Sequence, residues 1–330
     1  MIPGLMPRQL RSPQRCCLDK VALLALLRYT ANWLDQNQIT ASLMTIPRPI
    51  TITCTDGVKL AATLYPAKKL AIGAIMLAPA TGIGQRFYQH FAKFLSEQGF
   101  AVLTYDNRGI GQSDKHKHIM RNASLQCWGE LDMPAVLDTL KSLYPDIPLH
   151  LIGHSAGGQL VGLMPNSHQL HSFVTFGSSS GSLRNFDWPY KFKAHFYMNC
   201  FIPLTNLLFG QTQSQWVGMG EPLPKRVAAQ WQKWCNGQGY VKTEFGKGVT
   251  RHYYDELTQP SLWLTATDDE IARPQNVDEM LAVYSRIKAQ KKSLNPTTYG
   301  LNHIGHMRFF SRQCLPLWSI ASQWLQKQTA

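Results

Sequence analysis

The chain has 330 residues, of which 44% are hydrophobic and 16% are charged. This length excludes a small disulfide-stapled scaffold and this composition excludes a disordered polymer, so the sequence predicts a globular protein with a sizeable core. The 7 cysteines are an odd number without a CxxC pair, which fits neither a disulfide framework nor a zinc site. This cysteine pattern favours a reducing compartment, and we expect a cytoplasmic location.

The sequence carries a basic excess. Lysine and arginine number 33 against 20 aspartates and glutamates, which gives a net charge of +13. Such a charge favours anionic partners such as nucleic acid or a membrane surface. The basic residues are spread along the chain, however, and no nucleic-acid-binding motif accompanies them. We therefore expect a solvated basic surface and no nucleic-acid partner.

Residues 1–43 differ in composition from the rest, because they hold five basic residues against two acidic ones. Their one apolar run, Val21–Leu27, is far shorter than the roughly 20 residues that cross a bilayer. No small-residue cleavage site follows this run, so we expect neither a signal peptide nor an integral membrane segment. We interpret residues 1–43 as an N-terminal extension, either an amphipathic surface helix over Asp19–Gln36 or sequence upstream of a true start at Met44.

From residue 50 onward, short apolar runs alternate with longer helical stretches. Ile50–Cys54 and Lys59–Tyr65 flank the turn Thr55-Asp56-Gly57 and predict an antiparallel hairpin. Further apolar runs predict strands buried on both faces: Ile72–Ala78, Ala101–Tyr105, Leu149–Gly153, Phe173–Phe176 and Leu262–Ala266. Helical patterns lie between them, over Gln85–Gln98, over Trp128–Leu143 and after Ser155. This alternation predicts an α/β fold with a parallel sheet covered by helices on both sides.

The strand rhythm stops between Ser178 and Leu257. A structureless loop of this length is improbable, so we predict an insertion over residues 178–257, with residues 44–177 and 258–330 forming the core. The insertion is rich in aromatic residues, including Trp188, Tyr190, Phe196, Trp216, Trp231 and Trp234. We expect these side chains to form an apolar pocket over the sheet, and packing inside the insertion is the alternative for any single one of them.

The most informative motif is Gly153-His154-Ser155-Ala156-Gly157, directly after an apolar strand and before a helix. Small residues surround Ser155, as a sharp strand-to-helix turn requires. The pattern predicts a nucleophile elbow that presents the Ser155 hydroxyl. We expect His154, inside the elbow, to have a packing role.

A serine hydroxyl needs a base to become a good nucleophile, and the base needs an orienting acid. The acid should follow a later strand, where Asp268, Asp269 and Glu270 occur in sequence; we choose Asp269, with Asp268 as the alternative. The base should come last in the chain. We choose His306, which follows a glycine in the loop before the last helix, and His303 is the alternative.

Acyl transfer also needs hydrogen-bond donors for the developing oxyanion. The backbone N–H of Ala156 is one candidate. The loop after the Ile72–Ala78 strand should supply the second, from Thr81 or alternatively from Ala80. His116 and His118 form an H-x-H pair without a further ligand set, so we expect no metal site and no cofactor.

The order serine, aspartate, histidine, together with Tyr105–Ser113, Thr267–Ala272 and Gly305–Phe310, resembles the α/β-hydrolase superfamily. The resemblance is closest to bacterial predicted hydrolases of the serine aminopeptidase and monoacylglycerol-lipase-like branch. It implies a mostly parallel eight-stranded sheet with a helical lid after the sixth strand. The chain departs from many relatives at Pro79-Ala80, where they have His-Gly.

These patterns predict a serine hydrolase that cleaves a small-molecule carboxylic ester or thioester with an apolar acyl group. An aminopeptidase-like amide hydrolase would need lid acids to hold the substrate ammonium; the lid offers Asp187, Glu221, Glu244, Asp255 and Glu256. A dehalogenase or epoxide hydrolase is disfavoured, because it would carry an aspartate at the position of Ser155. A non-catalytic binding protein on the same fold is the remaining alternative, and the sequence does not define the oligomeric state.

Overall fold

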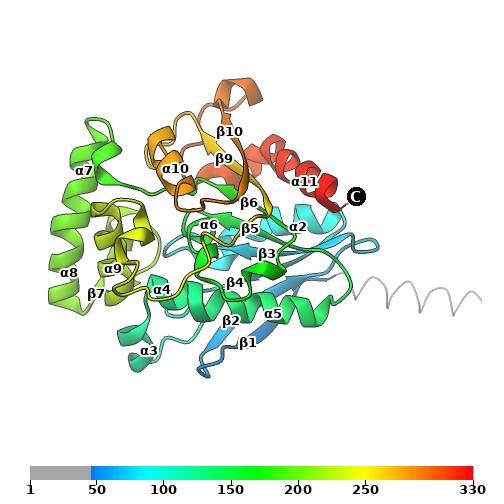
Figure 1. Cartoon of the computed structure of the whole chain (residues 1–330), viewed down its shortest axis with the longest axis horizontal. Helices are drawn as coiled ribbons and strands as arrows, with labels where there is room; N and C mark the ends of the chain where they lie inside the picture. Colours follow the sequence, from blue (N-terminus) through cyan, green and yellow to red (C-terminus); the bar gives the residue numbers. More distant parts are fainter. Residues whose placement is uncertain (1–45, 330) are drawn as a thin grey trace, which may run out of the picture. The chain divides into compact units, whose positions relative to one another are not determined.

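The computed structural model describes residues 46–329, so the predicted extension over residues 1–43 lies outside the described part. Its centre is an eight-stranded sheet with the order β1-β2-β4-β3-β5-β6-β9-β10 (Figure 1). The strands are β1 (Arg48–Thr53), β2 (Lys59–Tyr65), β3 (Gly73–Ala78), β4 (Phe100–Tyr105), β5 (Leu149–His154), β6 (Ser172–Phe176), β9 (Pro260–Ala266) and β10 (Lys288–Leu294). β1, β2 and β4 pair antiparallel, and every other pair is parallel. The prediction of a mostly parallel eight-stranded α/β sheet is confirmed.

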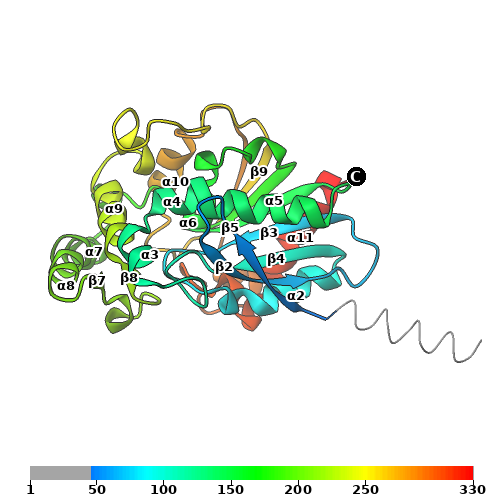
Figure 2. The same cartoon turned by 90° about the horizontal axis from the view of Figure 1, so that it is seen from below.

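Helices cover both faces of this sheet, as Figure 2 shows for α5 on one side and α2 on the other. Side chains of α2 (Gln89–Glu97) and α11 (Leu315–Thr329) join one buried cluster, with Ile75 of β3. Side chains of α5 (Met133–Leu143) and α10 (Pro274–Leu281) join the other cluster, with Met76 of β3. Neighbouring strand residues therefore face opposite layers, which is why these strands are continuous apolar runs.

The edge strand β10 differs from the central strands. Residues of β3, β4, β5 and β6 are buried at every position, whereas Lys288–Leu294 is exposed at all positions but the last. Lysines along an exposed edge discourage pairing with another chain. No apolar run marks β10 in the sequence.

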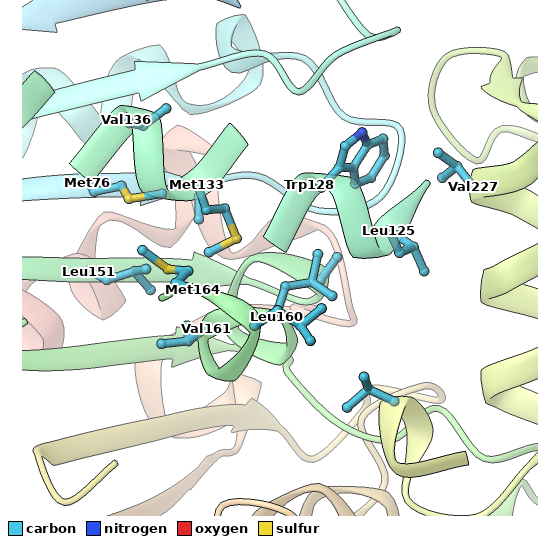
Figure 3. Packing of buried hydrophobic residues seen from close by; sticks show 14 of the residues in the cluster. Met76, Leu125, Trp128, Met133, Val136, Leu151, Leu160, Val161, Met164 and Val227 are labelled. Carbon is cyan, nitrogen blue, oxygen red and sulfur yellow. The ribbon is translucent and has the colours of Figure 1, made fainter. Parts of the chain in front are cut away.

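Figure 3 shows the core beside the elbow. Met76 and Leu151 of the sheet face Met133 of α5, while Trp128 lies near Val227 of α9 (Lys225–Asn236), all within one buried cluster. Trp128 begins a π-helical turn, Trp128–Asp132, which leads from the short helix α4 (Leu125–Cys127) into α5. The core therefore extends without interruption from the sheet to a helix of the insertion.

The insertion between β6 and β9, which we call the lid, is mainly helical. Besides α9 it contains α7 (Tyr190–Phe196), a π-helical turn over Tyr197–Phe201, and α8 (Ile202–Phe209). It also contains a small antiparallel sheet of β7 (Gln211–Thr212) and β8 (Leu223–Pro224), which the sequence pattern did not predict. α7, α8 and α9 lie together beside the sheet, with α3 (Lys117–Asn122) below them (Figure 1). None of the described helices has the length and apolar character that crossing a membrane requires.

Candidate active site

Ser155 lies at the sharp turn between β5 and α6 (Ala156–Gln159). Its backbone has φ 48° and ψ −110°, a conformation that few non-glycine residues adopt. The chain passes itself closely here, because a Cβ at Gly153 would lie 2.4 Å from the Gly158 nitrogen. A Cβ at Gly157 would lie 2.2 Å from the Ala78 oxygen. The small residues of the motif are thus required by the turn that holds Ser155.

Ser155 and His306 line one cavity of about 410 Å³. Thr81 and Ala80, in the loop after β3, also line it. The lid supplies most of the remaining wall, including Phe186, Tyr190, Phe196, Met198, Phe201 and Trp231. The candidate nucleophile therefore faces a space that is mostly apolar.

Asp269 and His306 form a close pair at the edge of this cavity. The His306 Nδ1 and the Asp269 Oδ2 atoms are 2.8 Å apart, and the Asp269 side chain is completely buried. The other carboxylate oxygen accepts hydrogen bonds from the amides of Ile271 at 2.8 Å and Ala272 at 2.9 Å. Burial by itself raises the pKa of Asp269, but His306 and these amides outweigh it and hold the pKa below its ordinary value. An ionised Asp269 is therefore available to orient the ring.

Asp268, the alternative acid, has different partners. Its carboxylate accepts hydrogen bonds from the amides of Ile304 at 2.9 Å and Gly305 at 3.0 Å, and it lies 2.5 Å from His303 Nδ1. Burial raises the pKa of Asp268, but the two amides and His303 together lower it below its ordinary value. Asp268 thus fixes the backbone of the loop, whereas Asp269 contacts the ring of His306.

Ser155 and His306 line the same cavity, and no hydrogen bond joins their side chains among residues 46–329. Hydrogen bonds between a nucleophile and its base are often long before substrate binds. The His306 ring packs against Gly177, where a Cβ would lie 3.0 Å from His306 Cε1. The absence of a side chain at Gly177 is what gives the ring this position.

The candidate oxyanion donors differ in their availability. The Ala80 amide donates a hydrogen bond to the Tyr88 hydroxyl at 2.9 Å, so it is already used. Within the described residues, the amides of Thr81 and Ala156 donate to no protein acceptor. Ala156 begins α6 directly after Ser155, and Thr81 lines the cavity. The geometry favours Thr81 over Ala80.

His154 has a role that the sequence pattern missed. Its Nδ1 lies 2.9 Å from the Tyr88 hydroxyl and its Nε2 lies 3.0 Å from the His306 carbonyl oxygen. Because a carbonyl only accepts, Nε2 carries the proton and Nδ1 accepts the hydrogen bond from Tyr88. Burial, and secondly the proximity of His306, lower the pKa of His154 to about 3, so the ring is neutral. A buried chain of hydrogen bonds therefore joins the amide of Ala80 to the backbone of His306.

The expectation that six lid aromatics form the pocket is wrong for half of them. Tyr190, Phe196 and Trp231 line the cavity. Trp188 and Trp216 are exposed instead, and Trp234 is fully buried inside the lid. Composition identifies the lid as aromatic, but the facing of each ring depends on how the helices pack. His116 and His118 stack with ring centroids 6.0 Å apart, and no cluster of metal-ligating side chains occurs within residues 46–329.

The architecture and the site together define a protein with the α/β-hydrolase fold. Residues 71–179 match the family model described as serine aminopeptidase, S33, which confirms the resemblance seen in the sequence. No protein among the curated sequences matches the chain.

Solved structures support this fold. The chain is similar to a soluble variant of monoglyceride lipase from Saccharomyces cerevisiae, with 15% identity, a TM-score of 0.61, and coverage of 87% of this chain and 97% of that one. It is also similar to a thermostable carboxyl esterase from Bacillus coagulans, with 14% identity, a TM-score of 0.58, and coverage of 86% and 99%. An esterase of Pyrococcus furiosus shows 14% identity, a TM-score of 0.57, and coverage of 88% and 94%.

Proposed function

We propose that the protein is a serine hydrolase that cleaves carboxylic esters or thioesters with an apolar acyl group. The observation that carries this proposal is that Ser155, on its strained turn, lines the same largely apolar cavity as His306, whose ring is held by the buried Asp269. The similar esterases and monoglyceride lipase are consistent with it.

In the proposed mechanism, Ser155 Oγ attacks the carbonyl carbon while its proton passes to His306 Nε2. Asp269 accepts a hydrogen bond from Nδ1 and stabilises the resulting imidazolium. The amides of Ala156 and Thr81 bind the oxyanion. The proton then moves to the departing alcohol or thiol, leaving an acyl-enzyme, and water repeats the sequence to release the acid and restore Ser155.

An amide hydrolase that binds a free N-terminus is the second candidate, and the structure offers it little support. No aspartate or glutamate lines the cavity in the described part of the chain. Three of the lid acids are instead paired with basic side chains: Asp187 with Arg273, Glu221 with Lys115, and Glu244 with Lys233. Among residues 46–329, the cavity therefore offers no carboxylate to hold a substrate ammonium group.

A fluorophosphonate probe tests the proposal directly, because it reacts with activated serines. We expect the wild-type protein to be labelled and Ser155→Ala not to be. Hydrolysis of p-nitrophenyl esters should fall about 10³-fold or more in that variant. The control is Ser142→Ala, an exposed serine outside the cavity, which should keep its labelling.

Three results would contradict the proposal. Equal labelling of wild type and Ser155→Ala would show that the labelled nucleophile is a residue other than Ser155. Absence of labelling in the folded wild-type protein would favour a non-catalytic binding protein. Faster cleavage of aminoacyl anilides than of p-nitrophenyl esters, tested from the acetate to the laurate, would favour the amide hydrolase instead.

A further inference from the structure

The lid carries an apolar surface that no other described residue covers. Among residues 46–329, 15 large hydrophobic side chains are exposed, and nine of them lie between residues 188 and 217. We call these nine side chains the lid face: Trp188, Phe192, Phe196, Leu204, Leu207, Leu208, Phe209, Trp216 and Val217. Single exposed hydrophobic residues are ordinary, but a cluster of this size marks an interaction site.

Most of the lid face belongs to one continuous helical segment, formed by α7, the π-helical turn and α8 (Figure 1). Phe192 and Phe196 are four residues apart on α7, and Leu204 and Leu208 are four residues apart on α8, so each pair shares one side of its own helix. A surface helix normally presents polar residues outward. Here Leu207 is 77% exposed and Leu208 is 63% exposed, so the outward side is apolar.

Charge distinguishes between the possible occupants of the lid face. Residues 188–220 contain no aspartate or glutamate, whereas Lys191 and Lys193 lie on α7. Lys225 and Arg226 are exposed at the start of the neighbouring helix α9. A second copy of the chain would bring these like charges together. A surface that combines apolar contacts with negative charge would instead match both features, and tryptophans such as Trp188 and Trp216 are typical of bilayer interfaces.

The lid face continues into the cavity. Phe196 and Val217 are exposed and also line the cavity that holds Ser155. Lys193 lines its opening as well, and no ion pair engages it among the described residues. A molecule lying against the lid face is therefore next to the entrance of the candidate active site.

We propose that the lid face docks on the surface of a lipid bilayer containing anionic lipids. Its apolar side chains enter the boundary between headgroups and acyl chains, and the neighbouring lysines face anionic headgroups. Docking in this position lets an ester dissolved in the bilayer enter the cavity without crossing bulk water. This last step rests on the proposed hydrolase function, whereas docking itself does not.

Co-sedimentation of the full chain with vesicles tests the docking. Vesicles of phosphatidylcholine with phosphatidylglycerol should bind the protein, and binding should weaken with added salt. The double variant Leu207→Ser with Leu208→Ser should bind these vesicles at least about tenfold more weakly than the wild type does. The matched control is Leu70→Ser with Leu315→Ser, at positions 91% and 50% exposed outside the lid, which should bind as the wild type does.

Phe192→Ser, on α7, provides a second lid variant should the double variant fold poorly. Equal binding of wild type and folded lid variants, or no binding of the wild type to these vesicles, overturns the proposal. A dimer that is lost in the lid variants, without vesicle binding, would assign the lid face to a second copy of the chain. Ser155→Ala should still bind vesicles, so failure of docking and failure of the hydrolase proposal are separate results.

Discussion

Two buried tyrosines allow the hydrogen-bond chain behind the candidate site to be tested. The Tyr88 hydroxyl accepts from the Ala80 amide and donates to His154, whereas the equally buried Tyr105 hydroxyl has no partner. Tyr88→Phe therefore leaves two buried polar groups unsatisfied, each at a cost of about 1–3 kcal/mol, so we expect the free energy of unfolding to fall by about 2–6 kcal/mol. Tyr105→Phe removes an unpaired hydroxyl and should leave stability unchanged or raise it by up to about 1 kcal/mol.

Urea denaturation at neutral pH measures both changes, provided that the m-values agree with that of the wild type. Activity gives an independent readout, because the chain ends at the backbone of His306 and at the loop of Thr81. We expect kcat for a water-soluble ester to fall about tenfold in Tyr88→Phe, with little change in KM. If Tyr88→Phe costs no more stability than Tyr105→Phe, the assignment of partners in this chain is wrong.

Two further predictions concern the acids and a buried histidine. Asp269→Asn should lower kcat about 10³- to 10⁴-fold, because it disturbs the orientation of His306, whereas Asp268→Asn should lower it only about tenfold; steady-state kinetics that show equal losses would contradict their different roles. His150 is buried, and burial, with a smaller effect of His171, lowers its pKa to about 3. Its pKa in the folded state lies below the unfolded value of about 6.5, so its contribution to stability is complete above that pH and is lost on acidification. Between pH 7.5 and pH 5, the free energy of unfolding measured by urea titration should fall by about 2 kcal/mol less in His150→Gln than in the wild type. An equal fall in both proteins would show that His150 does not titrate in this way.

The central strands could be predicted from the sequence, because burial on both faces demands continuous apolar runs. The run Leu149–Gly153 agrees with β5 to within one residue. β10 could not be found in this way, because Lys288–Leu294 lies at the edge and pairs only with β9. Its strand conformation comes from this pairing rather than from its own composition.

The lid shows a second limit of sequence patterns. The π-helical turn Tyr197–Phe201 between α7 and α8 changes the helical repeat, so spacing along α7 does not predict the facing of residues on α8. Phe196 is exposed while Tyr197 and Met198, its neighbours, are buried. Which aromatic side chains reach the cavity is therefore decided by the packing of the lid helices.

Tyr88 and His154 illustrate a third limit. They are 66 residues apart and meet only after the sheet has brought α2 and β5 together. A tyrosine before a helix and a histidine in a glycine-rich turn each have ordinary local explanations. Only the three-dimensional contact shows that they connect the two loops that flank Ser155.

The neighbouring acids Asp268 and Asp269 explain how the fold can place a histidine from near the end of the chain. The carboxyl ends of parallel strands meet at one edge of the sheet, which brings the loop after β9 close to Ser155. Asp268 holds the backbone of the incoming loop through two amides, and Asp269 holds the ring of His306. Holding the loop in place reduces the conformational freedom that the His306 ring must lose to act as the proposed base. The two carboxylates are therefore not interchangeable, although residue type and position alone make either one a plausible partner for the histidine.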